Sequence, residues 1–147
     1  MLSGEIEIIL VEDNASDAEL ITRTLRKSNL ANHIVLVKDG AEALDLLFGE
    51  NGRAAKAADG IPRVVLLDIK LPKVDGIEVL RRMKSDERTR EIPVVMLTSS
   101  NEDQDIRAAY ALGVNSYVTK PIRFAEFAKV VSELGVYWMM LNVPPAQ

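Results

Sequence analysis

The sequence predicts an α/β protein in which helices cover both faces of a parallel sheet. Short runs of aliphatic residues alternate five times with longer segments of helical spacing, and no hairpin turn joins two predicted strands. The 147 residues have room for one domain of ordinary size. Apolar residues make up 48% of the chain and charged residues 27%, so a substantial core can form.

The first two strand–helix units are predicted between residues 6 and 48. Residues 6–11 are nearly all apolar, which is typical of a strand buried on both faces. The helix that follows is predicted to begin with a capping box, in which Ser16 and Glu19 satisfy each other's free backbone amides. A second strand over 34–37 leads to Asp39, which is expected to cap the next helix.

Three further units are predicted after a long connection over residues 49–62. That connection is rich in Ala, Gly and charged residues, and we interpret it as a surface insertion, with a functional loop as the alternative. The predicted strands cover 64–67, 92–97 and 116–119, and the predicted helices cover about 75–86, about 101–112 and a segment from about 123.

Composition excludes several kinds of chemistry. The chain has no cysteine, which rules out disulfides and thiolate metal sites. Its single histidine argues against a histidine-centred catalytic triad. The net charge of −4 argues against binding to nucleic acid. The N-terminus lacks a signal-peptide pattern and no apolar run approaches the length of a membrane span, so we expect a cytoplasmic protein with no membrane partner.

Polar residues follow each predicted strand at its carboxyl end, where open parallel sheets bind their ligands. Several of these residues are explained equally well as loop starts and helix caps. In chain order they are Glu12 and Asp13, Lys38 and Asp39, Asp68, Thr98 and Ser99, and Lys120 and Pro121.

Asp68 is not explained as a helix cap, because the four residues 71–74 intervene before the helical pattern resumes near Asp75. A carboxylate at the end of a buried strand costs free energy unless another group compensates it, and the acids Glu12 and Asp13 are expected nearby. Mg2+ prefers oxygen ligands and would neutralise this cluster. The residues therefore predict a magnesium site at this edge of the sheet.

The same residues resemble the receiver domain of two-component response regulators. The pattern consists of an acidic pair, Glu12-Asp13, a lone Asp68, then Thr98 and finally Lys120-Pro121, each after its own strand. The resemblance covers residues 5–135 and implies a flavodoxin-like, doubly wound sheet of five parallel strands in the order 2-1-3-4-5, with five helices in a three-layer α/β/α arrangement. The first acid is Glu here, where the family more often has Asp.

The resemblance also implies the roles of the site residues. Asp68 would accept a phosphoryl group from a phosphohistidine on a histidine kinase. Mg2+ would be bound by Asp13, Asp68 and the backbone carbonyl of Lys70, with Glu12 contributing through water. Lys120 would pair with one phosphoryl oxygen. Thr98 would donate a hydrogen bond to another.

A conformational switch is implied as well. In the family the threonine moves toward the phosphoryl group and an aromatic residue turns inward, and Tyr117 stands at the matching offset from Lys120. An ordinary half-buried strand tyrosine is the alternative reading of Tyr117. The resemblance also implies a cis peptide bond before Pro121. The expected output surface is the fourth helix, the fifth strand and the last helix.

The C-terminal segment carries an unusual concentration of apolar residues. Residues 136–141 are six apolar residues in succession, and five of the seven aromatic residues lie at or after Tyr117. We expect a homodimer through the last helix and this extension, to which the fourth helix and fifth strand could add, with the alternative that the extension folds back over the domain. The residues assigned to this dimer and output face are Phe127, Val131, Tyr137 and Trp138.

We therefore expect a single receiver domain over 1–147, with an extension at 136–147 and no room for an output domain. Such a protein would signal by binding another, unidentified protein, and the Tyr-Trp ending resembles single-domain regulators paired with phytochrome-type histidine kinases. Its chemistry would be limited to its own phosphorylation and dephosphorylation. A phosphohydrolase of the haloacid-dehalogenase type would need an acid where Lys70 stands, and a pseudo-receiver would lack acceptor or metal ligands.

Overall fold

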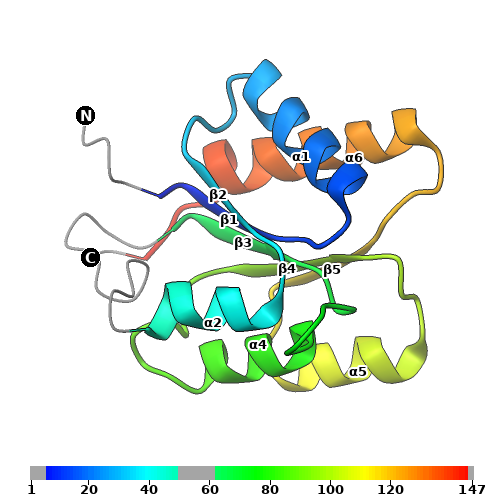
Figure 1. Cartoon of the computed structure of the whole chain (residues 1–147). Helices are drawn as coiled ribbons and strands as arrows, with labels where there is room; N and C mark the ends of the chain where they lie inside the picture. Colours follow the sequence, from blue (N-terminus) through cyan, green and yellow to red (C-terminus); the bar gives the residue numbers. More distant parts are fainter. Residues whose placement is uncertain (1–5, 50–61, 146–147) are drawn as a thin grey trace.

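The computed structural model describes residues 6–49 and 62–145 and has three layers (Figure 1). Most of the predicted 49–62 connection lies outside the described residues. The strands are β1 (Ile8–Val11), β2 (Ile34–Val37), β3 (Val64–Leu67), β4 (Val94–Thr98) and β5 (Ser116–Thr119). The helices are α1 (Ala15–Lys27), α2 (Gly40–Phe48), α4 (Gly76–Lys84), α5 (Asp103–Ala111), α6 (Phe124–Val136) and the π-helical turn η1 (Tyr137–Leu141).

The five strands form one parallel sheet in the order β2-β1-β3-β4-β5, which confirms the predicted fold. Helices α1 and α6 cover one face, and α2, α4 and α5 cover the other (Figure 1). The strand order changes direction between β1 and β3, so the loops that follow these two strands flank the point at which such sheets bind ligands. The fold therefore places Glu12, Asp13 and Asp68 at the expected edge.

Each face of the sheet has its own hydrophobic core. Alternate side chains of the central strands point to opposite faces, so Ile9 and Val11 pack toward α2, α4 and α5, whereas Ile8 and Leu10 pack toward α1 and α6. All residues of β1, β3 and β4 are buried. The loops that carry Glu12, Asp13, Asp68 and Ser100 therefore each begin at the end of a buried strand.

The cap of α2 follows the sequence pattern, and the cap of α1 does not. Asp39 accepts a hydrogen bond from the backbone N–H of Glu42, as predicted. At α1 the prediction of a capping box is wrong: the cap is Asn14, whose side chain accepts from the N–H of Asp17 at 2.9 Å. Ser16 lies inside the first turn, because the helix begins earlier than its apolar spacing suggests.

The C-terminal extension folds back on the α1–α6 face of the sheet. Trp138 is 8% exposed and packs in the same core as Phe127 and Val131, which are 5% and 0% exposed. The assignment of these three residues to a dimer and output face is therefore wrong, because their side chains are buried in the core of the chain itself. Tyr137, by contrast, is 48% exposed, and its ring lies nearly perpendicular to the Trp138 ring with the ring centroids 4.9 Å apart.

The predicted cis bond before Pro121 is also wrong. No cis peptide bond occurs within residues 6–49 and 62–145. The trans form is the intrinsically preferred one for any bond that precedes proline. Within the same ranges, no helix is both long and apolar enough to cross a bilayer.

Candidate phosphoryl-acceptor site

The loops after β1, β3 and β5 bring three carboxylates and one ammonium group together. The backbone N–H of Asp68 donates to the carbonyl of Val11, which ties the end of β3 to that of β1. Lys120 follows β5, and its backbone N–H donates to the carbonyl of Thr98 at 2.7 Å. These two bonds, together with the register of the sheet, fix the loops after β1, β3, β4 and β5 relative to one another.

Lys120 is the electrostatic centre of the site. Its Nζ lies 2.7 Å from Glu12 Oε1, 3.0 Å from Asp68 Oδ2 and 2.9 Å from Asp17 Oδ2. Its side chain is only 7% exposed, so these contacts are shielded from water. A buried cation with three acidic partners holds the Asp68 carboxylate in a defined orientation.

The surroundings shift the pKa values of both Glu12 and Lys120. Burial raises the pKa of Glu12 to about 7, and the ammonium of Lys120 only partly offsets this effect. Burial alone would lower the pKa of Lys120, but its hydrogen bonds to Glu12 and Asp17 and the nearby charge of Asp68 raise that pKa above its ordinary value. Lys120 therefore stays charged at neutral pH, and Glu12 is poised to exchange a proton.

Asp68 is oriented by its own loop. Its Oδ1 accepts the backbone N–H of Ile69 at 2.7 Å, which leaves Oδ2 directed at Lys120. The loop then returns tightly to α4: the N–H of Gly76 donates to the carbonyl of Ile69 at 2.8 Å. A Cβ atom at Gly76 would overlap the carbonyl oxygen of Asp68, so a residue without a side chain is required there.

Three carboxylates fit a divalent cation. Glu12, Asp13 and Asp68 each offer an oxygen, and these oxygens lie within 4.8 Å of one another. Asp13 is exposed while the other two are buried, so the cluster opens to solvent on one side. Hard oxygen donors with an open side suit Mg2+ or Mn2+, which keep several waters when bound.

A second polar network lies beside the acceptor. Thr98 is fully buried, and its hydroxyl accepts from the N–H of Ser100 at 3.3 Å. The hydroxyl of Tyr117 donates to the carbonyl of Ser100 at 2.8 Å, and the Ser100 hydroxyl donates to Asp105 at 2.5 Å. Lys70 lies 3.7 Å from the same carboxylate of Asp105. Thr98 and Tyr117 thus meet at the loop between β4 and α5.

Sequence reasoning missed two members of these networks, Asp17 and Asp105. Both stand in the first turn of a helix, where an acidic residue is usually explained by the helix dipole. For Asp17 a signal was present, because that turn begins only a few residues after the acidic pair at the same sheet edge. Of the other polar residues predicted at this edge, Asp39 caps α2 and lies 3.6 Å from Lys73, away from the cluster.

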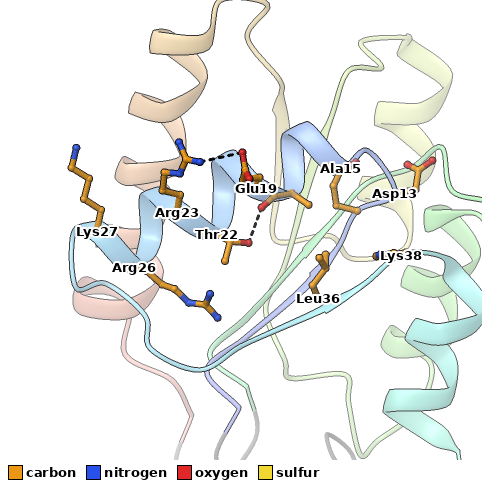
Figure 2. Close-up of a pocket in the computed structure, with 11 residues that line it drawn as sticks. Asp13, Ala15, Glu19, Thr22, Arg23, Arg26, Lys27, Leu36 and Lys38 are labelled. Atoms are coloured by element: carbon orange, nitrogen blue, oxygen red, sulfur yellow. Dashed lines mark hydrogen bonds and ion pairs between the residues drawn. The ribbon is translucent and has the colours of Figure 1, made fainter.

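A groove of about 840 Å³ runs from the acidic pair along α1 (Figure 2). Its floor includes Leu36 of the edge strand β2, which is 39% exposed. Its wall includes Arg23, paired with Glu19 at 3.1 Å, and the side chain of Arg26 (Figure 2). The groove gives solvent a path to Asp13.

The fold and this constellation of residues define a receiver domain, and the comparisons agree. Residues 8–132 match the model of the response regulator receiver domain, and the chain belongs to that family. A probable methanogenesis regulatory protein, FilR2, from Methanothrix harundinacea is 45% identical over 94% of this chain and 86% of its own length.

Two response regulators of cyanobacteria are similar to this chain along nearly their whole length. Response regulator Rcp1 of Synechocystis is 35% identical over 95% of this chain and 92% of its own length. Its crystal structure with bound Mn2+ covers 97% of this chain and all of that chain with a TM-score of 0.84. The phosphorylated cyanobacterial phytochrome response regulator RcpA is 37% identical, with a TM-score of 0.87 over 97% of this chain and 99% of its own.

Proposed function

We propose that this chain is a response regulator that accepts a phosphoryl group on Asp68 from a phosphohistidine of a histidine kinase. The observation that carries the proposal is the geometry at Oδ2 of Asp68, which lies 3.0 Å from Lys120 Nζ at the edge of a carboxylate cluster. An oriented carboxylate can act as a nucleophile, and phosphoryl transfer depends mainly on positioning and charge stabilisation.

In the transfer, an oxygen of Asp68 forms a bond to phosphorus while the bond from phosphorus to the imidazole nitrogen breaks. The electron pair of that bond stays with the imidazole nitrogen of the kinase. Lys120 neutralises negative charge on a phosphoryl oxygen, and the Thr98 hydroxyl donates a hydrogen bond to another. The product is an acyl phosphate, which water can hydrolyse.

Mg2+ is the proposed physiological cation. Glu12, Asp13, Asp68 and the backbone carbonyl of Lys70 are the groups that would hold it, with Glu12 acting through a water. When bound, the cation neutralises phosphoryl charge and orients the transferring group. The carboxylate of Glu12 also contacts Lys120 and accepts from the N–H of Asn14, so it lies between the cluster and these two residues.

Phosphorylation would be transmitted through Thr98 and Tyr117 to the face formed by α5, β5 and α6. Tyr117 is half-buried, and its hydroxyl bonds to the carbonyl of Ser100. If Thr98 moves toward the phosphoryl group, its bond with the N–H of Ser100 breaks and the loop that holds Tyr117 is released. The tyrosine ring can then turn inward, which changes the surface offered to an unidentified downstream protein.

The kinase partner is proposed to be of the phytochrome type, because similar proteins such as RcpA are phytochrome response regulators. Homodimerisation is proposed through the exposed side of the C-terminal extension. Val136, Tyr137, Met140 and Leu141 remain exposed there after Trp138 is buried. Elution as a monomer at high micromolar concentration, both with and without beryllofluoride, would contradict the dimer.

The phosphoacceptor assignment is tested by labelling the purified chain with acetyl phosphate. Label is expected on the wild type in the presence of Mg2+ and not after chelation. Asp68→Asn is expected to abolish labelling, whereas Asp103→Asn, which alters an exposed aspartate in the first turn of α5, should label like the wild type. Stoichiometric labelling of Asp68→Asn would refute the assignment.

A further inference from the structure

The ammonium group of Lys120 has no hydrogen-bonding capacity left in this structure. Its Nζ has three N–H donors, and three carboxylates lie within hydrogen-bonding distance. If a phosphoryl oxygen on Asp68 is also to bond to Lys120, one of the present partners has to be replaced. The identity of that partner decides how readily the site accepts the phosphoryl group.

Asp17 is the partner that can be released at the lowest cost. The side chain of Asp17 is 28% exposed, compared with 2% for Glu12 and 8% for Asp68. A carboxylate that loses its partner in a buried position is left unpaired, whereas an exposed one is rehydrated. Asp17 also lies outside the cluster of Glu12, Asp13 and Asp68 that fits a metal ion. Its release therefore leaves the metal ligands in place.

The position of Asp17 keeps it available beside Lys120. It belongs to the first turn of α1, where its N–H is held by Asn14 and the helix dipole favours a negative side chain. It also lines a cavity of about 260 Å³, next to Lys120, whose other walls include Leu20 and Phe124. The carboxylate can thus turn from Lys120 into solvent without any change in the backbone.

We propose that Asp17 is a positioning residue that holds Lys120 in the unphosphorylated chain and yields it to a phosphoryl oxygen on Asp68. The inference rests on the proposed function of Asp68. Under this inference Asp17 competes with the phosphoryl group for the ammonium of Lys120. A residue that merely supported Lys120 would have the opposite effect when removed, because the ammonium would lose its orientation.

The test compares Asp17→Asn with Glu19→Gln, which removes the same charge from the same helix at an exposed position that contacts Arg23. Beryllofluoride affinity in saturating Mg2+ and the initial rate of labelling by phosphoramidate are measured for both. Asp17→Asn is expected to improve each by about fivefold, equal to about 1 kcal/mol, since one charged hydrogen bond no longer competes. Glu19→Gln should change neither by more than about twofold.

Three further measurements separate competition from general effects. Calorimetric titration with Mg2+ alone should give the same affinity for Asp17→Asn and wild type, because Asp17 is not a metal ligand. Asp17→Glu keeps a carboxylate within reach of Lys120 and should behave like the wild type. The gain in Asp17→Asn should persist at high salt, where long-range charge effects are screened.

Beryllofluoride affinity or labelling that is unchanged or lower in folded Asp17→Asn would overturn the inference, as would an equal gain in Glu19→Gln. Wild type that takes no label would contradict the proposed function of Asp68 and the inference together. Wild type that is labelled at Asp68, with no gain in Asp17→Asn, would contradict the inference alone.

Discussion

Replacement of Trp138 tests whether the C-terminal extension belongs to the core of the domain. The side chain is 8% exposed and packs with Val131 and Phe127 on the α1–α6 face. The neighbouring Tyr137 is 48% exposed, and its ring forms a T-shaped pair with the Trp138 ring. The two adjacent aromatic residues therefore form a matched pair, one buried and one half-exposed.

The expected loss of stability can be worked from this burial. A tryptophan side chain that is removed from water buries roughly 200 Å², and at about 25 cal/mol per Å² this corresponds to an upper limit of about 5 kcal/mol. Because Trp138 lies at the end of the domain, its neighbours can partly fill the cavity that truncation leaves. Trp138→Ala is therefore expected to lower the free energy of unfolding by about 3 kcal/mol. Tyr137→Ala should cost less than about 1 kcal/mol.

The assay is urea unfolding followed by circular dichroism, because Trp138 is the only tryptophan of the chain and its loss removes the fluorescence signal. Measurements at two protein concentrations separate folding within the chain from dimerisation. Equal losses for Trp138→Ala and Tyr137→Ala would refute the packing described above. A loss that appears only at high protein concentration would place Trp138 in an interface between chains.

Three further predictions concern the acceptor site. The pKa of Glu12 is raised to about 7 from 4.5, so its contribution to the stability of the metal-free fold is full below about pH 4.5 and is lost as the pH rises through about 7. Below pH 7 a proton on Glu12 competes with Mg2+ for the carboxylate. Calorimetry should therefore show the affinity of the wild type for Mg2+ falling by up to about tenfold per pH unit, and no such fall in Glu12→Gln. Lys120→Met should slow labelling by acetyl phosphate by about a hundredfold, and a change below threefold would contradict its role. Gly76→Ala places a Cβ against the Asp68 carbonyl oxygen and should lower the free energy of unfolding in urea by about 2 kcal/mol. An unchanged urea midpoint would show that the loop between Asp68 and Gly76 can shift to accept a side chain.

The fold could be predicted from the sequence because each strand carries a near-continuous apolar run and each helix a distinct apolar stripe. The order of the strands came from the family resemblance, and the sheet confirms it. Element boundaries differ by a few residues from the prediction: the helix predicted to begin near residue 101 begins at Asp103, and the cap of α1 is Asn14. Capping depends on local backbone angles, which the spacing of apolar residues does not determine.

The burial of the extension could not be predicted from the run of apolar residues at 136–141. Such a run fits packing within the chain and packing between chains equally well, and only the path of the backbone after α6 decides which side chains turn inward. The role of Asp17 was hidden for a different reason. Its contact with Lys120 joins residues 103 positions apart, so the only sequence signal for it was the position of Asp17 shortly after the acidic pair.

The most direct test of the central claim is to identify the residue that carries the acyl phosphate. After labelling with acetyl phosphate and Mg2+, borohydride reduces an aspartyl phosphate to homoserine, and peptide mass spectrometry then locates the altered residue. Conversion at Asp68, dependent on Mg2+ and absent from the unlabelled chain, is the expected result. Conversion at a different carboxylate, with Asp68 unmodified, would contradict the account.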